Sequence, residues 1–269
     1  MGLRVRQVRQ LLGLATATAL CALLSGAHAA APVGAAALGP PQPEFRFARL
    51  AYNDSAALGG FGRGFRGGSW TTDAPEAEQH LLGGIRRLTR ISTLDPDRDQ
   101  FIAIAPNDDD LYDYPFLYAV EVGRWYLSDE EAAKLRDYLL RGGFLMVDDF
   151  HGSLQWEGFM ESMRRVFPDR DVVEIPDNHE VFHVVWDLDH KVQIPGVYAL
   201  MSGRTYEQDG VEPHWRGVFD DHGRLMVAIN FNMDLGDAWE HADTPEYPQP
   251  LTALAYRFGI SYALYAMSH

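Results

Sequence analysis

The chain has 269 residues, and its 38 acidic and 23 basic side chains leave a formal net charge of −15 at pH 7. This balance disfavours nucleic acid as a partner, because binding to a phosphate backbone draws on clustered lysine and arginine. The only cysteine is Cys21. A chain that has lost its first residues would therefore contain no disulfide and no thiol nucleophile.

The first 29 residues have the pattern of a signal peptide. Three arginines between residues 4 and 9 precede an apolar run over 11–24, and Ala27-His28-Ala29 has the small-x-small form of a cleavage site. The run is shorter than the roughly 20 residues that a membrane-spanning helix needs. We therefore expect a periplasmic or secreted protein without a membrane span after cleavage, with a retained anchor as the alternative.

Residues 30–44 are rich in Ala, Gly and Pro and are expected to form a flexible lead-in to one domain over residues 45–269. The glycine-rich stretch GGFGRGFRGGSW, residues 59–70, is spaced somewhat like a phosphate-binding loop. It lacks the strand–turn–helix context and the later acidic residue that such a loop requires. We favour a mobile surface loop.

Short apolar strands and amphipathic helices alternate through the first part of this domain. We expect strands at 45–52, 101–105, 115–122, 144–147 and 172–175, and helices starting at Pro75, at the Ser128–Glu131 capping box and after residue 147. Continuous apolar strands are typical of a parallel sheet that is buried on both faces. The alternation therefore predicts a doubly wound, mainly parallel α/β fold.

After residue 177 the pattern becomes more β-like. We expect further strands at 181–186, 197–201, 215–219 and 225–231, with a turn at 221–223 between the last two. A long apolar helix over 251–267 ends the chain. No second domain boundary is indicated.

The strand GGFLMVDD ends in Asp148 and Asp149, and His151 follows. Neighbouring residues on a strand point to opposite faces, so we expect one aspartate to face the crevice at the carboxyl ends of the strands. The other would cap a helix or pair with a base. With His151, these residues are candidates for acid–base catalysis or for divalent-metal binding. The alternative is that they only satisfy backbone donors at a helix start.

His179-Glu180-Val181-Phe182-His183 matches the H-E-x-x-H pattern of zinc peptidases. That pattern requires a helix, whereas the β-branched and aromatic residues here favour a strand. On a strand the two histidines would lie about 13 Å apart, too far to share one ion. We therefore place His179 and His183 as ligand-binding candidates, and expect one of them to reach the Asp148/Asp149 crevice.

A third polar stretch follows the strand at 225–231. Its candidates for binding a cation or hydroxyl groups are Asn232, Asp234, Asp237, Trp239 and Glu240. The competing interpretation is a capped helix start with Trp239 as a packing residue.

These motifs occur together and in this order in one known family. The chain from Phe45 to His269 resembles the bacterial domain-of-unknown-function family 4159. The matching motifs are FARL at 47–50, YPFLY at 114–118, LSxEE at 127–131, LRxYL at 135–139, GGFLxVDD at 142–149, RVFP at 165–168, HxxxH at 179–183 and NxDLGxAW at 232–239.

The resemblance implies a flavodoxin-like fold similar to class I glutamine amidotransferases and ThuA proteins. It does not imply the amidotransferase reaction, because the catalytic cysteine is absent here. Family members are often encoded beside, or fused to, MoxR-type ATPases and von Willebrand A proteins, which implies a role in an envelope assembly.

From the residues and the resemblance together, we expect an envelope protein that binds a small polar ligand or a divalent metal in an acidic and histidine-containing crevice. The alternative is a non-thiol, metal-assisted hydrolase or lyase that acts on a small polar or sugar-like substrate. A zinc peptidase is the least favoured interpretation.

Overall fold

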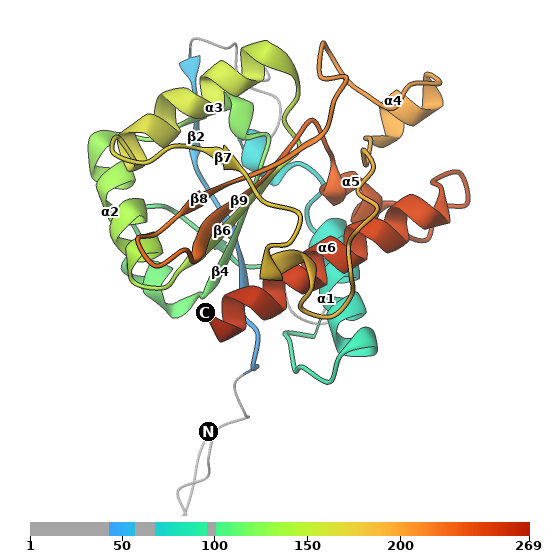
Figure 1. The fold of residues 1–269 in the computed structure, drawn as a ribbon, viewed down its shortest axis with the longest axis horizontal. Coiled ribbons are helices and arrows are strands. Elements are labelled where there is room, and N and C mark those ends of the chain that lie inside the picture. Colours follow the sequence, from blue (N-terminus) through green and yellow to red (C-terminus); the bar gives the residue numbers. More distant parts are fainter. Residues whose placement is uncertain (1–42, 57–67, 96–100) are drawn as a thin grey trace, which may run out of the picture. The chain divides into compact units, whose positions relative to one another are not determined.

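A computed structural model describes residues 43–56, 68–95 and 101–269 (Figure 1). The predicted signal peptide, nearly all of the lead-in and most of the glycine-rich stretch lie outside these ranges. The described residues belong to one compact unit.

A seven-stranded sheet with the order β3-β1-β4-β6-β9-β8-β7 forms the centre of this unit. Its strands are β1 (Phe47–Leu50), β3 (Ala103–Ile104), β4 (Phe116–Val120), β6 (Phe144–Asp148), β7 (Val173–Glu174), β8 (His214–Phe219) and β9 (Leu225–Phe231). A separate antiparallel pair joins β2 (Asn53–Asp54) to β5 (Trp125–Tyr126).

The first five strands of the order are parallel to one another. Numbered along the chain, they stand in the order 2-1-3-4-5 of a flavodoxin-like sheet. Strands β8 and β7 extend this sheet in antiparallel pairing beside β9. The predicted α/β class and the mainly parallel, doubly wound sheet are confirmed.

Helices cover both faces of the sheet (Figure 1). They are α1 (Glu76–Leu88), α2 (Asp129–Leu140), α3 (Gly152–Val166), α4 (Val197–Met201), α5 (Leu235–Glu240) and α6 (Gln249–Ser268). One core cluster packs α1, α5 and α6 against Phe144 and Met146 of β6. The other packs α2 and α3 against Leu145 and Val147 of the same strand. Alternate residues of a buried strand therefore serve opposite layers, as the pleat requires.

Local signals in the sequence explain several of these boundaries. Helix α2 begins with the predicted capping box, in which the Ser128 hydroxyl accepts a hydrogen bond from the Glu131 amide and the Glu131 carboxylate accepts one from the Ser128 amide. Four short 3-10 segments complete the described structure: η2 (Ser69–Thr71), η3 (Asp109–Asp113), η4 (Val122–Arg124) and η5 (Glu180–Phe182).

Two predicted strands are wrong. Residues 181–186 begin in the 3-10 turn η5. His179 caps the start of this turn, because its Nδ1 accepts a hydrogen bond of 3.2 Å from the Val181 amide. The turn buries Val181 and Phe182 without a strand. Residues 197–201 form α4, where Tyr198 and Met201 are exposed. Apolar composition alone does not determine backbone conformation, and both segments satisfy amides through local hydrogen bonds instead of a strand partner.

No helix in the described part of the chain is both long and apolar enough to cross a membrane.

Candidate functional site

Polar side chains gather at the carboxyl edge of the parallel strands. Asp148 ends β6 and Asp149 follows it, while Asp234 lies just beyond β9. Asp73 comes from the connection between β1 and α1. Strand β1 occupies the point in the sheet where the strand order reverses. Ligands of open α/β sheets bind at this edge and near this reversal, because the loops separate there.

The backbone at this edge is strained in four places. Glu121, Asp149 and Asn232 are the first residues after β4, β6 and β9, and their φ angles are 55°, 51° and 63°. Asp73 also has a φ of 63°. A left-handed conformation in a residue other than glycine costs of order 1–3 kcal/mol and is concentrated at functional sites. Strain at three neighbouring strand ends therefore marks this edge as the candidate site.

Asp148 has a structural role at this edge. Its Oδ2 accepts hydrogen bonds from the amides of Leu235 (2.7 Å) and Gly236 (3.0 Å), and from the Tyr118 hydroxyl (3.2 Å). These two amides are the first of helix α5, so the carboxylate satisfies donors that a helix start leaves unpaired. Asp148 is the aspartate that caps a helix, one of the two arrangements that the sequence predicted.

Asp149 instead contacts His151, whose Nε2 lies 3.2 Å from Asp149 Oδ1. Both side chains are buried. Burial lowers the pKa of His151, so the imidazole is neutral at pH 7. Burial, followed by repulsion from Asp237 and Glu207, raises the pKa of Asp149 well above its ordinary value.

Three carboxyl groups converge where Asp149 lies. One oxygen each of Asp73, Asp149 and Asp234 lies within 4.8 Å of the other two, and we call these residues the aspartate group. Burial raises the pKa of Asp73 and of Asp234 well above the ordinary value, and repulsion between the carboxylates adds to this effect. Ionisation of all three carboxyl groups would therefore place like charges close together at a largely buried position without enough cationic compensation.

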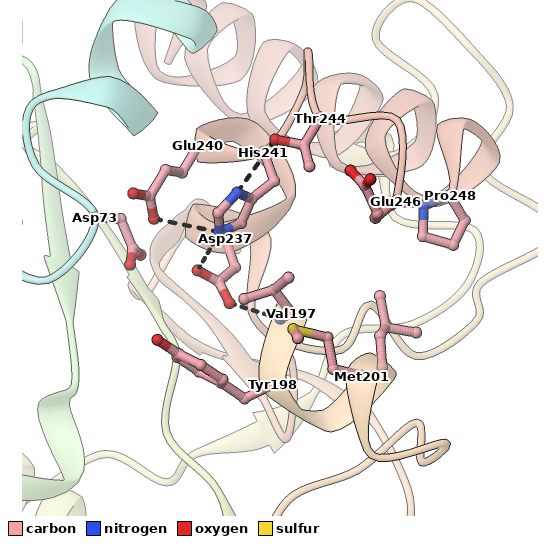
Figure 2. A pocket seen from close by; sticks show the side chains of 11 residues that line it. Asp73, Val197, Tyr198, Met201, Asp237, Glu240, His241, Thr244, Glu246 and Pro248 are labelled. Carbon is pink, nitrogen blue, oxygen red and sulfur yellow. Dashed lines mark hydrogen bonds and ion pairs between the residues drawn. The ribbon is translucent and has the colours of Figure 1, made fainter.

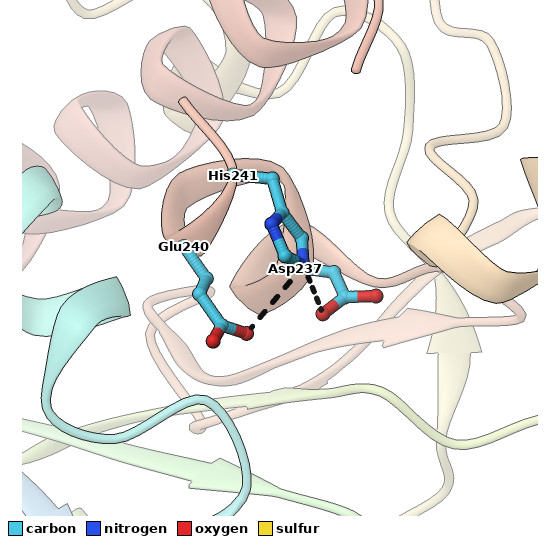
Figure 3. A group of neighbouring side chains, drawn as sticks. All are labelled: Asp237, Glu240 and His241. Carbon is cyan, nitrogen blue, oxygen red and sulfur yellow. Dashed lines mark ion pairs between the residues drawn. The ribbon is translucent and has the colours of Figure 1, made fainter. Parts of the chain in front are cut away.

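A second group lies next to the first along α5. One ligand atom each of Asp237, Glu240 and His241 lies within 4.8 Å of the others, and Figure 3 shows the three side chains facing one another. We call these residues the pocket triad. Asp234 Oδ1 accepts a hydrogen bond from the Asp237 amide at 2.7 Å, so one aspartate group member caps the helix that carries the triad.

The triad faces a cavity of about 760 Å³ that Asp73 also lines. Figure 2 shows the carboxyl groups of Asp73, Asp237 and Glu240 close together, with Val197 and Met201 of α4 as apolar neighbours. None of the described residues that line the cavity is lysine or arginine. The cavity is thus an acidic pocket with one apolar wall.

Residues 46–267, which contain both groups, match the family described as Domain of unknown function (DUF4159). The chain belongs to the DUF4159 family. The match covers nearly all of the described residues and confirms the resemblance predicted from the motifs. No curated protein matches the chain. The further likeness to amidotransferases and ThuA proteins stays a prediction.

The structure does not bring His179 and His183 to the site of this DUF4159 protein. His179 packs against Phe219 and Tyr265, beside the turn that precedes β9 and so at the opposite edge of the sheet. His183 Nδ1 lies 2.8 Å from Asp187, and its Nε2 lies 2.9 Å from the Asp177 carbonyl. Neither histidine belongs to a potential metal-binding group among the described residues. The expectation that one of them reaches the crevice is corrected, because the segment turns at η5 instead of continuing as a strand.

Two other predicted residues serve the fold. Asn232 Oδ1 accepts a hydrogen bond from the Gly152 amide at 2.9 Å, and its Nδ2 donates to the Glu212 carbonyl at 2.7 Å. Trp239 is fully buried and packs against Tyr118. The packing interpretation of Trp239 therefore matches the structure, whereas Asp234, Asp237 and Glu240 do lie in the two groups.

The sequence interpretation missed Asp73 and His241. Asp73 lies more than twenty residues beyond the end of the first strand, so it does not stand out as a strand-end acid. The rule that placed Asp149 at the carboxyl edge applies equally to the loop after β1 and would have found Asp73. His241 directly follows Glu240, where the predicted polar stretch ended.

Proposed function

We propose that this DUF4159 protein binds a divalent cation at the aspartate group. The observation that carries the proposal is the convergence of three carboxylate oxygens within 4.8 Å of one another. Oxygen ligands lie about 2.0–2.6 Å from Mg²⁺ or Ca²⁺, so two ligands of one ion are at most about 4–5 Å apart. The spread of the aspartate group fits one coordination sphere.

Charge supports the same proposal. Buried carboxylates are costly unless they are paired or bound to a metal. Burial and mutual repulsion raise the pKa of all three aspartates, which means that their ionised forms lack a sufficient counter-charge. Against this effect, Arg49 lowers the pKa of Asp73 and, together with Arg124, that of Asp149. However, Arg49 is already paired with Glu78, and Arg124 with Glu121. A bound dication would supply the missing charge.

Metal-assisted hydrolysis or elimination on a small polar or sugar-like substrate is a second candidate, favoured by the pairing of Asp149 with His151. A neutral imidazole beside a carboxylate can accept a proton from a metal-bound or substrate hydroxyl group. His151 Nδ1 is buried and has no hydrogen-bond partner. The proposed cation would polarise the substrate while this pair moves the proton.

The test is the metal content of the purified protein after dialysis against Mn²⁺ or Ca²⁺, measured for wild type and the Asp149→Asn variant. We expect the variant to lose one equivalent, because it loses a charged ligand at nearly constant volume. Asp110→Asn, a change at an exposed acid, is the matched control and should retain the wild-type content. Equal metal content in wild type and Asp149→Asn would contradict the proposal.

Gly196→Ala tests the same site without removing a ligand. A methyl group at Gly196 would lie 2.8 Å from both Asp234 Oδ2 and Glu207 Oε1, so the carboxylates would have to move. We expect the affinity for Mn²⁺ to fall at least tenfold in this variant. Gly83→Ala is the control, because a methyl group there meets nothing within 4 Å.

We further propose that the protein is exported and acts in the envelope, which is supported by the signal-like pattern of residues 1–29. Sequencing the amino terminus of the protein from the periplasm or medium of a producing bacterium would test this. A first residue at Ala30 is expected, and an intact Met1 in the cytoplasm would contradict the proposal. Assembly with MoxR-type or von Willebrand A proteins stays a prediction.

A further inference from the structure

We infer that the pocket triad, Asp237, Glu240 and His241, binds a second divalent cation beside the one proposed at the aspartate group. The inference rests on the proposed function and extends it to a two-cation centre. The three residues occupy positions i, i+3 and i+4 at the end of α5, which lie on one face of a helix. The helix itself therefore aims their side chains at a common point (Figure 3).

The distances within the triad fit shared ligation better than direct hydrogen bonding. His241 Nε2 lies 3.8 Å from Asp237 Oδ1 and 3.8 Å from Glu240 Oε2. Hydrogen bonds between nitrogen and oxygen are about 2.7–3.2 Å long, so neither contact is one. Two ligand atoms that each lie about 2.1 Å from a tetrahedral ion are separated by about 3.4 Å. A small contraction would place all three atoms around one ion.

The surrounding bonds leave the inward-facing atoms available. Asp237 Oδ2 accepts a hydrogen bond from the Val197 amide at 2.7 Å, which leaves Oδ1 toward His241. His241 Nδ1 lies 3.4 Å from the Thr244 hydroxyl, and Figure 2 shows this contact on the side of the ring away from the carboxylates. Histidine ligands of metals are commonly oriented in this way by a hydrogen bond to the second ring nitrogen.

Asp73, a member of the aspartate group, also borders the pocket that the triad faces. Its Oδ2 is buried and accepts no hydrogen bond, although Asp73 lines the same cavity as the triad. The described residues that line the cavity include the carboxyl groups of Asp73, Asp237 and Glu240 and no lysine or arginine. A cation in the pocket would compensate the triad and also attract the unpaired oxygen of Asp73.

The two groups are near neighbours. A methyl group at Gly196 would lie 2.8 Å from Asp234 Oδ2 and 3.2 Å from Asp237 Oδ2, so one small gap separates an oxygen of each group. Their donor sets differ, because the aspartate group offers only oxygen whereas the triad adds an imidazole nitrogen. Oxygen donors suit Mg²⁺, Ca²⁺ and Mn²⁺, and an added imidazole favours Zn²⁺. We expect the second site to prefer Zn²⁺.

Metal stoichiometry tests the inference. Titration of the full chain with Mn²⁺ and Zn²⁺ should give two equivalents for wild type and one for His241→Gln. Glu240→Gln, which keeps the shape of the side chain, should also give one. His222→Gln in the turn between β8 and β9 is the matched control and should give two, because the His222 side chain is exposed and its backbone amide supplies the hydrogen bond to Asp220 Oδ1.

The outcomes separate this inference from the proposed function. One equivalent in wild type that Asp149→Asn removes and His241→Gln retains would overturn the second site and leave the first intact. Loss of one equivalent in His241→Gln, together with loss of the other in Asp149→Asn, supports both sites. Circular dichroism of each variant shows whether a lost equivalent reflects unfolding, and an unfolded His241→Gln leaves Glu240→Gln to decide.

Discussion

Replacement of Arg49 by methionine is expected to lower the free energy of unfolding by about 3–5 kcal/mol, measured by urea denaturation. Arg49 is fully buried in β1, and its guanidinium pairs with the carboxylate of Glu78 in α1. It also donates to the Trp70 carbonyl at 2.9 Å and to the Thr72 carbonyl. Methionine fills similar space but leaves the Glu78 carboxylate buried without a counter-charge.

The double variant Arg49→Met/Glu78→Leu separates two roles of Arg49. It removes both charges of the pair, so most of the lost stability should return. We expect the affinity for Mn²⁺ to lie below that of wild type in both the single and the double variant. Thr72 directly precedes Asp73, and in both variants the Thr72 carbonyl lacks the hydrogen bond from Arg49 that holds this loop. A free energy of unfolding of Arg49→Met within about 1 kcal/mol of the wild-type value would contradict the stabilising role. Wild-type affinity for Mn²⁺ in the double variant would contradict the role in holding the loop.

The metal-free protein is expected to lose stability as the pH rises from about 6.5 to 8. Burial is the main cause that raises the pKa of the aspartate group and the pKa of Glu121, the latter to about 8. The folded state therefore binds more protons than the unfolded state, and stability falls with pH. Each carboxyl group that stays protonated over this range contributes a loss of about 2 kcal/mol.

His151 and the salt-bridged surface acids act outside this window. The pKa of His151 is lowered from 6.5, so it makes stability increase with pH only below that value. Salt-bridged surface acids such as Asp169, whose pKa its hydrogen bond to Arg136 lowers, lose their contribution only as the pH falls below about 4. His183, whose pKa its hydrogen bond to Asp187 raises from 6.5, also titrates within this window, so the comparison with the Asp149→Asn variant is needed to assign the slope to the buried carboxyl groups.

Thermal or urea unfolding at several pH values, with a chelator or with saturating Mn²⁺, measures this effect. Saturating metal should flatten or reverse the slope, because the bound aspartates are already ionised. Asp149→Asn should make the slope of the metal-free protein shallower, since it removes one of the titrating groups. Stability that is constant or rises from pH 6.5 to 8 without metal would contradict the prediction.

Much of the fold could be predicted because its signals are local. The strand at 225–231 was predicted with the bounds of β9, and the capping box at Ser128 correctly starts α2. The short buried strands β4 and β6 read as continuous apolar runs, as both faces of the sheet are covered. Segments 181–186 and 197–201 were mistaken for strands because apolar residues do not reveal whether a neighbouring strand edge is available.

The site was predicted only in part, because the local sequence does not show which segments lie side by side in the sheet. Asp149 and Asp234 stand out in the sequence, since each directly follows a recognisable strand or its turn. Asp73 lies about 160 residues from Asp234 in the chain, and only the successive pairing of β1 with β4, of β4 with β6 and of β6 with β9 places them together. The contact between His151 and Asp149 is local, whereas the displacement of His179 to the opposite edge depends on the turn η5.

The amino-acid sequence by itself determined the α/β class, the family, the absence of any thiol beyond Cys21 and the placement of acids at the strand ends. These properties depend on residue type and on spacing within one element. Only the tertiary structure decided which acids share a site, that Asp148 caps α5 while Asp149 faces Asp73, and that His241 rather than His183 completes a potential metal-binding group. Those outcomes depend on strand order and on left-handed turns at the strand ends, which bring together side chains that no local pattern connects.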